Sequence, residues 1–346
     1  MYNGKILKNG ELYIGSSNVD VSNIFKSQKL NEIAKTNPLI AHADILIETL
    51  DEVESLIPDH LRDTFYKNLK TLDIKIVDEI ECKYDGLVVA ANYNIKENSI
   101  IINKEQIKVI QKRIAKKYPD CTINDYLKRT ITHELFHMAS TVYNKENKSL
   151  RSGVIQKNIN NAIINLSLNE GITEVLTIKT NIHENFEDIT KYNHFIRLTN
   201  QLIQLIGYDY IIYSYFGNYG IERIIELLAE IDLDYIKAKK VMDTFSIVHP
   251  ERKNENDILN LINFQISLLE YFTVQLKQYK KEQNYDEIDK IIKCISENTI
   301  QFNTTNKKMQ KITEYPNSIV KQKFYDIMEK YGNLNKDSYQ RKRKAN

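Results

Sequence analysis

The sequence predicts an α+β protein that is mostly α-helical, with a small β-sheet in its first third. Three short runs rich in β-branched residues lie between residues 72 and 103, whereas most of the remaining chain has apolar residues at helical spacing. From this pattern we expect four segments. They are an N-terminal hairpin and helices over 1–70, a central domain over 71–220, a helical C-terminal region over 221–340, and a basic, disordered tail over 341–346.

The first segment combines a hairpin signal with helical periodicity. Asn9-Gly10 separates two short runs of alternating apolar residues, which predicts a hairpin at about residues 4–15. Apolar positions recur at helical spacing over the rest of the segment, and Pro38 and Pro58 stand where helices could begin. We therefore expect two or three helices there.

The predicted sheet consists of the runs LDIKIV, GLVVAAN and SIIIN, which begin at Leu72, Gly86 and Ser99. Polar residues at 94–98 link the last two runs, which predicts a hairpin. Residues 104–117 then follow with helical periodicity.

The remaining elements are predicted to be helices. One runs over about 124–143, and a second runs over about 153–180 after a polar loop at 144–152. Further helices are expected at 192–206, 220–229, 257–280, 285–296 and 318–331. The helix at 257–280 carries an apolar stripe that we assign to packing: Ile258, Leu261, Phe264, Leu268, Tyr271, Phe272 and Leu276.

Composition gives no sign of a nucleic-acid, membrane or disulfide-rich protein. The chain has 48 Lys+Arg and 46 Asp+Glu, and a net charge of +2 predicts neither a nucleic-acid nor a membrane partner. Cys82, Cys121 and Cys294 fit neither a disulfide framework nor a CxxC metal site, so we expect free thiols. The N-terminus has no apolar signal segment, and no stretch approaches the roughly 18 apolar residues that span a bilayer. We expect a cytoplasmic protein, with leaderless export left open; no pattern specifies its oligomeric state.

The residues that carry chemistry begin with an HExxH motif at 133–137. On a helix this spacing places His133 and His137 one turn apart on one face, with Glu134 beside them, which suits a divalent metal ion. An apolar stripe is expected to pack this helix into the core: Ile131, Leu135, Met138 and Val142.

A second motif lies downstream, where residues 168–174 read LNEGITE on a predicted helix. Together with HExxH, this NEGxTE segment resembles the ligand helix of gluzincin metallopeptidases, which has NExxSD in thermolysin-like enzymes and NEGF in zinc aminopeptidases. The resemblance implies that Glu170 is the third metal ligand beside the two histidines. It also implies that Glu174 accepts the second ring N–H of a ligand histidine, and that Gly171 lets the two helices approach closely.

The same resemblance implies a fold and a subclass. It implies a zincin-like small sheet before the HExxH helix and the Glu-ligand helix, with an edge strand within 86–103 that pairs with the substrate backbone. The chain has no GxMxN sequence, the amine-binding signature of the aminopeptidases, which favours an endopeptidase.

Two comparisons with known zinc peptidases limit the assignment. Glu170 follows His137 by 33 residues, a wider gap than in thermolysin-like and aminopeptidase members, so the loop at 144–152 is expected to absorb an insertion. The metzincin motif HExxHxxGxxH is excluded, because Ser140 and Tyr143 stand where it requires Gly and His.

The implied function is zinc-dependent hydrolysis of peptide bonds in a peptide or protein substrate, with one Zn²⁺ per chain. Glu134 is expected to act as general base on a metal-activated water. Gluzincins stabilise the oxyanion with a Tyr or His later in the chain, and the candidates here are Tyr208, Tyr215 and Tyr219.

Two alternatives stay open. One is a zincin-like zinc-binding domain with a regulatory or binding role and no turnover, although a purely structural site has no use for the general base Glu134. The other is a helical interaction protein whose basic residues 341–344 engage nucleic acid or an acidic partner. No recognition motif or basic stripe accompanies those residues, so no nucleic-acid partner is expected.

Overall fold

The structure is a computed structural model of the 346-residue chain. The described residues are 5–8, 11–14, 23–78, 83–84, 87–117, 122–144, 149–157, 163–180, 192–217, 219–250, 254–302, 306–332 and 334. Helices predominate among them, and the strands form only small sheets, so the mostly helical class with a small β component is confirmed. The tail expected at 341–346 lies outside the described residues, as do Cys82 and Cys121.

The chain divides into two compact units, each built from several segments. Unit 1 comprises Met1–Gly153, Thr173–Ile189 and Tyr215–Gly217. Unit 2 comprises Val154–Ile172, Thr190–Ser214 and Asn218–Asn346. One boundary, at Ile172 and Thr173, falls inside helix α7 (Leu166–Lys179), so this helix contributes residues to both units. The domain boundaries expected from the sequence stay predictions.

Unit 1 begins with the expected hairpin and a group of helices. Strands β1 (Lys5–Lys8) and β2 (Glu11–Ile14) pair antiparallel around Asn9-Gly10, which confirms the predicted hairpin. Four α-helices follow where two or three were expected: α1 (Gln28–Thr36), α2 (Pro38–His42), α3 (Asp44–Leu56) and α4 (Arg62–Leu69). A 3₁₀ turn at Asp59–Leu61 follows Pro58 and leads into α4.

The boundary between α1 and α2 is set by Asn37. Its side-chain oxygen accepts a hydrogen bond from the Leu39 amide at 3.2 Å, and Pro38 occupies the first position of α2, as predicted. The side-chain amide of Asn37 donates to the carbonyls of Leu69 and Leu72, at 3.0 Å each, and so joins these helices to the start of the sheet.

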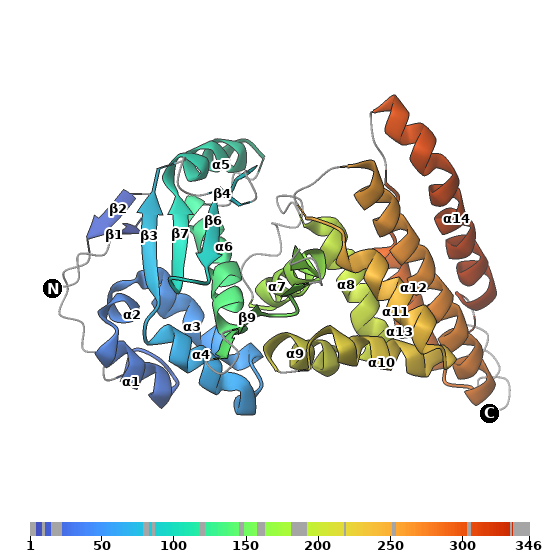
Figure 1. Cartoon of the computed structure of the whole chain (residues 1–346), viewed down its shortest axis with the longest axis horizontal. Helices are drawn as coiled ribbons and strands as arrows, with labels where there is room; N and C mark the ends of the chain where they lie inside the picture. Colours follow the sequence, from blue (N-terminus) through green and yellow to red (C-terminus); the bar gives the residue numbers. More distant parts are fainter. Residues whose placement is uncertain are drawn as a thin grey trace, which may run out of the picture. The chain divides into compact units, whose positions relative to one another are not determined.

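The central sheet has three strands in the order β3 (Asp73–Val77), β7 (Ser99–Asn103), β6 (Ala91–Asn94) (Figure 1). Strand β3 runs parallel to β7, and β6 runs antiparallel to β7. The turn between β6 and β7 is the predicted hairpin, and Asn98 adopts a left-handed conformation there with φ 49°. Among the described residues β6 is therefore an edge strand.

The run expected as one strand from Gly86 is divided in two. Leu87–Val88 forms β5, which pairs with β4 (Lys83–Tyr84), and Ala91–Asn94 forms β6. The two pieces belong to different sheets, so the apolar run changes pairing partner between Val88 and Ala91.

Helices α5 and α6 follow the sheet. Helix α5 (Lys104–Lys117) matches its prediction. Helix α6 (Ile123–Ala139) begins at a capping box, in which Thr122 and Asp125 exchange side-chain and backbone hydrogen bonds. It packs against α3, α4, β6 and β7 within unit 1 (Figure 1).

The prediction that the HExxH helix extends to residue 143 is wrong. It ends at Ala139, and the next residues form β8 (Thr141–Asn144), which pairs with β9 (Ser149–Ser152) where a loop was expected. The hydroxyls of Ser140 and Thr141 donate to the carbonyl of His137 at 3.1 and 2.7 Å, in place of helical amides. The β-branched pair Thr141-Val142 also favours a strand.

The prediction that the second long helix begins near residue 153 is also wrong. Short strands β10 (Gln156–Lys157) and β11 (Ile163–Ile164) precede α7. Asn165 has φ 64°, a left-handed conformation that stops a right-handed helix from extending back through it. The backbone amide of Asn165 donates to the carbonyl of Ser246 at 2.8 Å. A part of unit 2 that is distant in sequence thus helps to determine where α7 begins.

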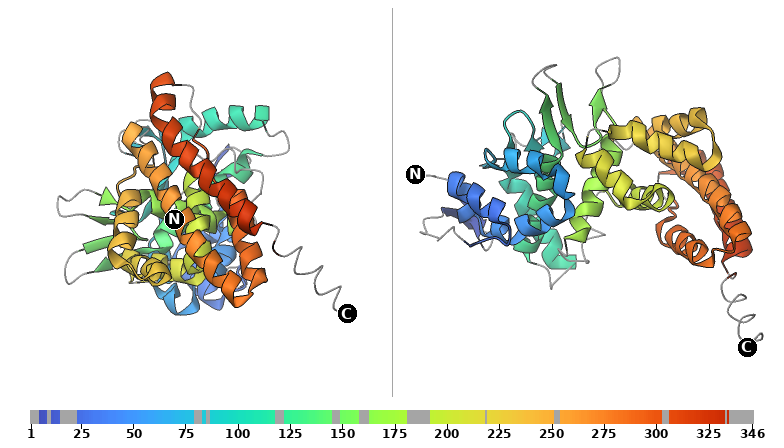
Figure 2. Two further views of the ribbon diagram at one scale, coloured as in Figure 1. Left: turned by 90° about the vertical axis from the view of Figure 1, so that its right-hand side faces the viewer. Right: turned by 90° about the horizontal axis from the view of Figure 1, so that it is seen from below.

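Unit 2 is largely a helical assembly. Its helices are α8 (Asn193–Ile206), most of α9 (Tyr208–Phe216), α10 (Gly220–Asp232), α11 (Tyr235–Ser246), α12 (Glu255–Glu282), α13 (Tyr285–Asn298) and α14 (Lys307–Tyr331). Helix α12 contacts α8, α10, α11, α13 and α14, and Figure 2 shows it side by side with α13 and α14. The predicted stripe on α12 is buried except for the half-buried Ile258, which confirms that it forms core. Helices α9 and α11 were not predicted, and α14 begins earlier than expected.

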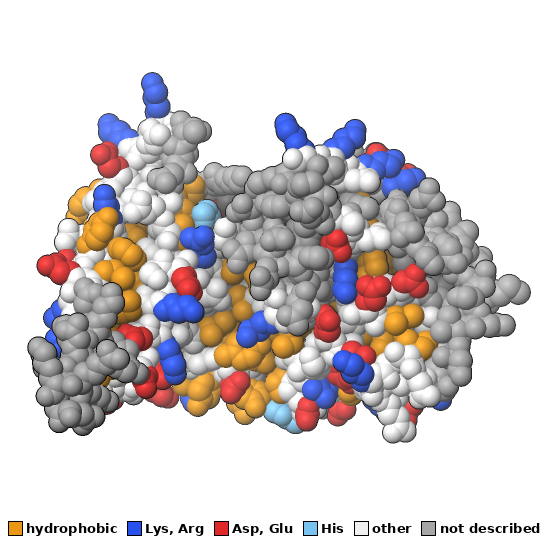
Figure 3. Space-filling model, turned by 180° about the vertical axis from the view of Figure 1, so that it is seen from behind, with side chains coloured by type: hydrophobic (Ala, Val, Ile, Leu, Met, Phe, Trp, Pro, Cys, Tyr) orange, Lys and Arg blue, Asp and Glu red, His pale blue; other side chains and the backbone are white. Residues whose placement is uncertain are grey.

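Acidic and basic side chains are interspersed on the face shown in Figure 3. Neither sign covers a continuous area of the described surface there, which agrees with the net charge of +2. None of the described helices combines the length and the apolar character that crossing a bilayer requires.

Replacing Thr122 with Ala tests whether the capping box stabilises α6. The substitution removes the side-chain acceptor of the Asp125 amide, so we expect a loss of about 1 kcal/mol in the free energy of unfolding. Thermal unfolding measures it, with Ser55→Ala on an exposed position of α3 as control. Equal melting temperatures for Thr122→Ala and wild type would contradict a stabilising cap.

Candidate metal centre

Helices α6 and α7 supply the residues that the sequence singled out as metal ligands and catalytic groups. His133, Glu134 and His137 lie on α6, and Glu170 and Glu174 lie on α7. All five side chains are buried, with exposed fractions between 2% and 9%.

The predicted apolar stripe holds α6 in place over most of its length. Ile131, Leu135 and Met138 are at most 2% exposed. Val142 does not belong to this stripe, because it lies in β8 beyond the end of the helix. The packed face of α6 thus ends one turn earlier than predicted, and the two histidines remain within the helix.

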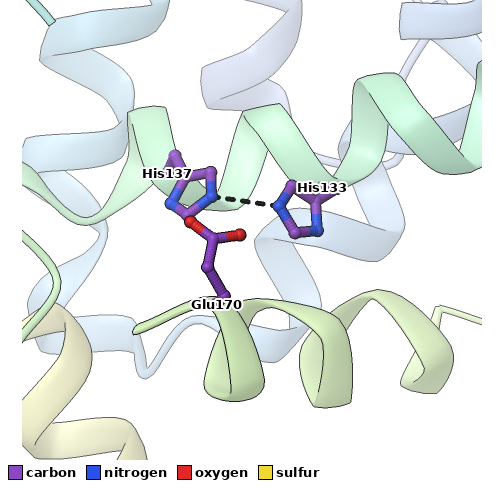
Figure 4. A group of neighbouring side chains, drawn as sticks. All are labelled: His133, His137 and Glu170. Atoms are coloured by element: carbon purple, nitrogen blue, oxygen red, sulfur yellow. Dashed lines mark hydrogen bonds between the residues drawn. The ribbon is translucent and has the colours of Figure 1, made fainter. Parts of the chain in front are cut away.

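His133, His137 and Glu170 form one group, whose donor atoms all lie within 4.8 Å of one another (Figure 4). The two histidine Nε2 atoms are 3.0 Å apart, and the rings meet edge to face with centroids 4.8 Å apart. Two nitrogens bound to one tetrahedral zinc ion at 2.0–2.1 Å would be about 3.4 Å apart. The observed spacing therefore needs to change by only a few tenths of an ångström to fit a shared ion.

The orientation of His133 is fixed from its other nitrogen. Nδ1 of His133 lies 3.3 Å from Oε1 of Glu174, within ion-pair distance but outside hydrogen-bond geometry. A carboxylate at this distance attracts a ring N–H, so the contact favours the tautomer with the proton on Nδ1. Nε2 then keeps its lone pair, which is the state that a metal ion requires.

Glu174 has a second buried partner that the sequence analysis missed. Arg129, on α6 one turn before His133, donates a hydrogen bond from its guanidinium to Oε2 of Glu174. The side chains of Arg129 and Glu174 are 9% and 3% exposed. The signal that could have identified Arg129 is its position four residues before His133, because residues at i and i+4 share a helix face.

Acidic side chains outnumber basic ones among the buried residues of these two helices. Helices α6 and α7 bury three carboxylates, those of Glu134, Glu170 and Glu174, and one guanidinium, that of Arg129. A nearby cation stabilises buried carboxylates. The donor set and this surplus of carboxylates both fit a divalent metal ion.

Hydrogen bonds along α7 explain other residues of the NEGxTE segment. The side-chain oxygen of Asn169 accepts from the Val154 amide at 3.1 Å, and Ser167 donates to the Val248 carbonyl at 2.8 Å; all four residues belong to unit 2. Asn169, the first residue of the NEGxTE segment, therefore holds the chain segment just before β10 in place. Sequence reasoning gave Asn169 no role of its own.

Gly171 allows a close approach, but the neighbouring helix is α8. A Cβ atom at Gly171 would lie 2.3 Å from Oγ1 of Thr199 and 2.9 Å from the carbonyl oxygen of Phe195, both on α8. The expectation that this glycine brings the HExxH helix and α7 together is therefore corrected: it brings α8 against α7.

The three tyrosines expected as oxyanion candidates occupy different environments. The hydroxyl of Tyr215 lies 2.7 Å from Oγ1 of Thr173 on α7, and its side chain is fully buried. Burial raises the pKa of Tyr208 to about 12, and the charge of Asp209 adds to the rise. Tyr219 is 67% exposed. The catalytic role of all three stays a prediction.

Another tyrosine, which the sequence did not single out, shares α6 with the HExxH motif. Tyr126 is on α6, seven residues before His133, and packs against Ile110 and Ile114. Burial raises the pKa of its phenol, a hydrogen bond with Thr130 and the charge of Arg129 oppose the rise, and the carboxylates of Glu174 and Glu134 add to it. Tyr126 therefore stays protonated at neutral pH.

No protein-family model, no curated protein and no solved structure matches this chain. Any functional conclusion therefore depends on the chemistry of the residues themselves.

Replacing Gly171 with Ala tests the packing of α7 on α8. The added methyl group meets a backbone carbonyl that cannot move freely, so we expect a loss of about 1–3 kcal/mol in the free energy of unfolding. Thermal unfolding of the metal-free protein measures this, with Lys179→Ala, exposed on the same helix, as control. Unchanged stability of Gly171→Ala would mean that the two helices can separate without loss.

Proposed function

We propose that this chain is a zinc-dependent peptidase of the gluzincin type, in which His133, His137 and Glu170 hold the metal ion. The observation that carries the proposal is the convergence of two Nε2 atoms and one carboxylate within 4.8 Å, from HExxH and NEGxTE helices. Two imidazoles and one carboxylate form the ligand set of a known class of catalytic zinc sites.

The number of donors favours a catalytic ion over a structural one. The group found among the described residues has three donors. Structural zinc is usually closed by four protein ligands, whereas catalytic zinc keeps one position open for water or substrate. This difference supports the enzyme over the alternative of a zinc-binding domain without turnover.

Each buried residue has a separate task in the proposed reaction. His133, His137 and Glu170 would hold the zinc ion, which would supply Lewis-acid chemistry for a scissile carbonyl and an attacking water. Glu134 takes the proton of the attacking water and delivers it to the leaving amine. Glu174 keeps the ring of His133 in the orientation that directs Nε2 at the ion.

The proposed substrate is an extended peptide that adds to the edge of the central sheet. Strand β6 is an edge strand among the described residues, and it packs against α6, the helix that carries His133 and Glu134. An exposed edge binds an extended peptide through backbone hydrogen bonds and so accepts many sequences. This mode suits an endopeptidase, which binds chain on both sides of the cleaved bond.

Metal content tests the ligand set. We expect wild-type protein, dialysed after loading with zinc, to keep about one zinc ion per chain, and Glu170→Ala to keep much less, because a third protein ligand is lost. Elemental analysis gives the ratio, with Glu48→Gln, an exposed glutamate of α3, as control. A wild-type protein that binds no zinc would remove the basis of the proposal.

Glu134→Gln tests the catalytic step separately from metal binding. The amide cannot accept the proton of water, so we expect zinc content to stay near that of the wild type while kcat/KM falls by about 10²–10⁴-fold. Cleavage of a mixture of unstructured peptides, followed by mass spectrometry, provides the assay. Full activity in Glu134→Gln contradicts its role as base, and zinc-loaded wild type that cleaves nothing favours the binding domain.

A further inference from the structure

The carboxylate of Glu174 has two buried partners, one for each oxygen. Oε1 faces Nδ1 of His133 at 3.3 Å, and Oε2 accepts from the guanidinium of Arg129. These three residues belong to unit 1, and their side chains are between 3% and 9% exposed. Water therefore has little access to replace either partner.

We propose that Arg129 is a positioning residue of the metal centre, which fixes the Glu174 carboxylate so that His133 presents Nε2 to the ion. The inference rests on the proposed function only through its metal site, because it concerns metal affinity and not the cleavage reaction. Arg129 touches neither the ligand atoms nor a substrate in this role.

The geometry explains why a second partner is needed. A glutamate side chain has three rotatable bonds, and the 3.3 Å contact with the imidazole alone leaves its carboxylate free to rotate. The guanidinium binds the other oxygen and removes this freedom. The oxygen that faces Nδ1 then has one position, and the ring of His133 has one orientation.

The arrangement of the three residues on two helices supports this role. Arg129 and His133 lie one turn apart on the same face of α6, so a single side chain on α7 can reach both. The neighbouring residue Lys128 pairs instead with Glu48 on α3, at 3.4 Å. The chain thus offers a control cation on the same helix that is not directed at the metal centre.

The test measures zinc dissociation constants by competition with a chromophoric chelator for wild type, Arg129→Met and Lys128→Met. Loss of contacts behind a metal-ligating histidine typically weakens binding by about 10–100-fold, and we expect this for Arg129→Met. Lys128→Met should stay within about twofold of the wild type, because its ion pair is partly exposed. Arg129→Lys, which keeps a cation for the carboxylate, should lose less affinity than Arg129→Met.

A double-mutant cycle separates positioning from a general structural role. If Arg129 acts through Glu174, then adding Arg129→Met to Glu174→Gln should change the zinc dissociation constant by no more than about threefold. The double variant also buries neither charge, so it remains usable if Arg129→Met alone does not fold. Melting temperatures of the metal-free proteins, recorded in chelator, report structural damage independently.

Three outcomes would overturn the inference. The first is a folded Arg129→Met protein with the zinc affinity of the wild type. The second is a double variant whose loss of zinc affinity equals the sum of the losses in Arg129→Met and Glu174→Gln. The third is a wild-type protein that binds no zinc. Peptide cleavage is a separate measurement: a zinc-loaded wild type without activity contradicts the proposed function, and the zinc affinities still decide the role of Arg129.

Discussion

The candidate site depends on one buried carboxylate, that of Glu174, and on the two groups of α6 that it binds. A carboxylate excluded from water is strongly unfavourable unless it is paired and hydrogen-bonded, so the contacts to Arg129 and His133 restrict where Glu174 can lie along α6. Glu170 lies one turn before Glu174 on the same face of α7, and it is Glu170 whose carboxylate converges with the two histidines. The pairing of Glu174 therefore also constrains the register of the third proposed ligand.

The C-terminal end of α6 is held by side-chain hydrogen bonds, which keeps the two histidines on a rigid element. The carbonyl of His137 accepts hydrogen bonds from Thr141 and Ser152, at 2.7 and 3.3 Å, so the β8–β9 hairpin is attached to the last turn of α6. The amide of Asn68 on α4 donates to the carbonyls of Met138 and Thr141 at 2.8 and 2.7 Å. A metal site supported in this way loses little conformational freedom when an ion binds.

Sequence reasoning succeeded where the signal is local and failed where distant residues decide. The Asn9-Gly10 hairpin, the start of α2 at Pro38 and the grouping of His133 with His137 follow from neighbouring residues alone. The start of α7 does not, because it depends on a hydrogen bond to Ser246, which is remote in sequence. At the end of α6, local hydrogen bonds from Ser140 and Thr141 are joined by a remote one from Asn68. Arg129 was missed for the same reason. An arginine on a predicted helix is usually expected at the surface, and its partner Glu174 is 45 positions away.

The buried carboxylates of α6 and α7 have different places in the proposed site. Arg129 pairs with Glu174, and of Glu134 and Glu170 only Glu170 belongs to the donor group. A zinc ion bound there would attract the charge of Glu134 without having Glu134 as a ligand. A carboxylate that is held near a cation and does not bind it is suited to accept a proton from water, which is the property that a hydrolytic site needs beyond metal binding.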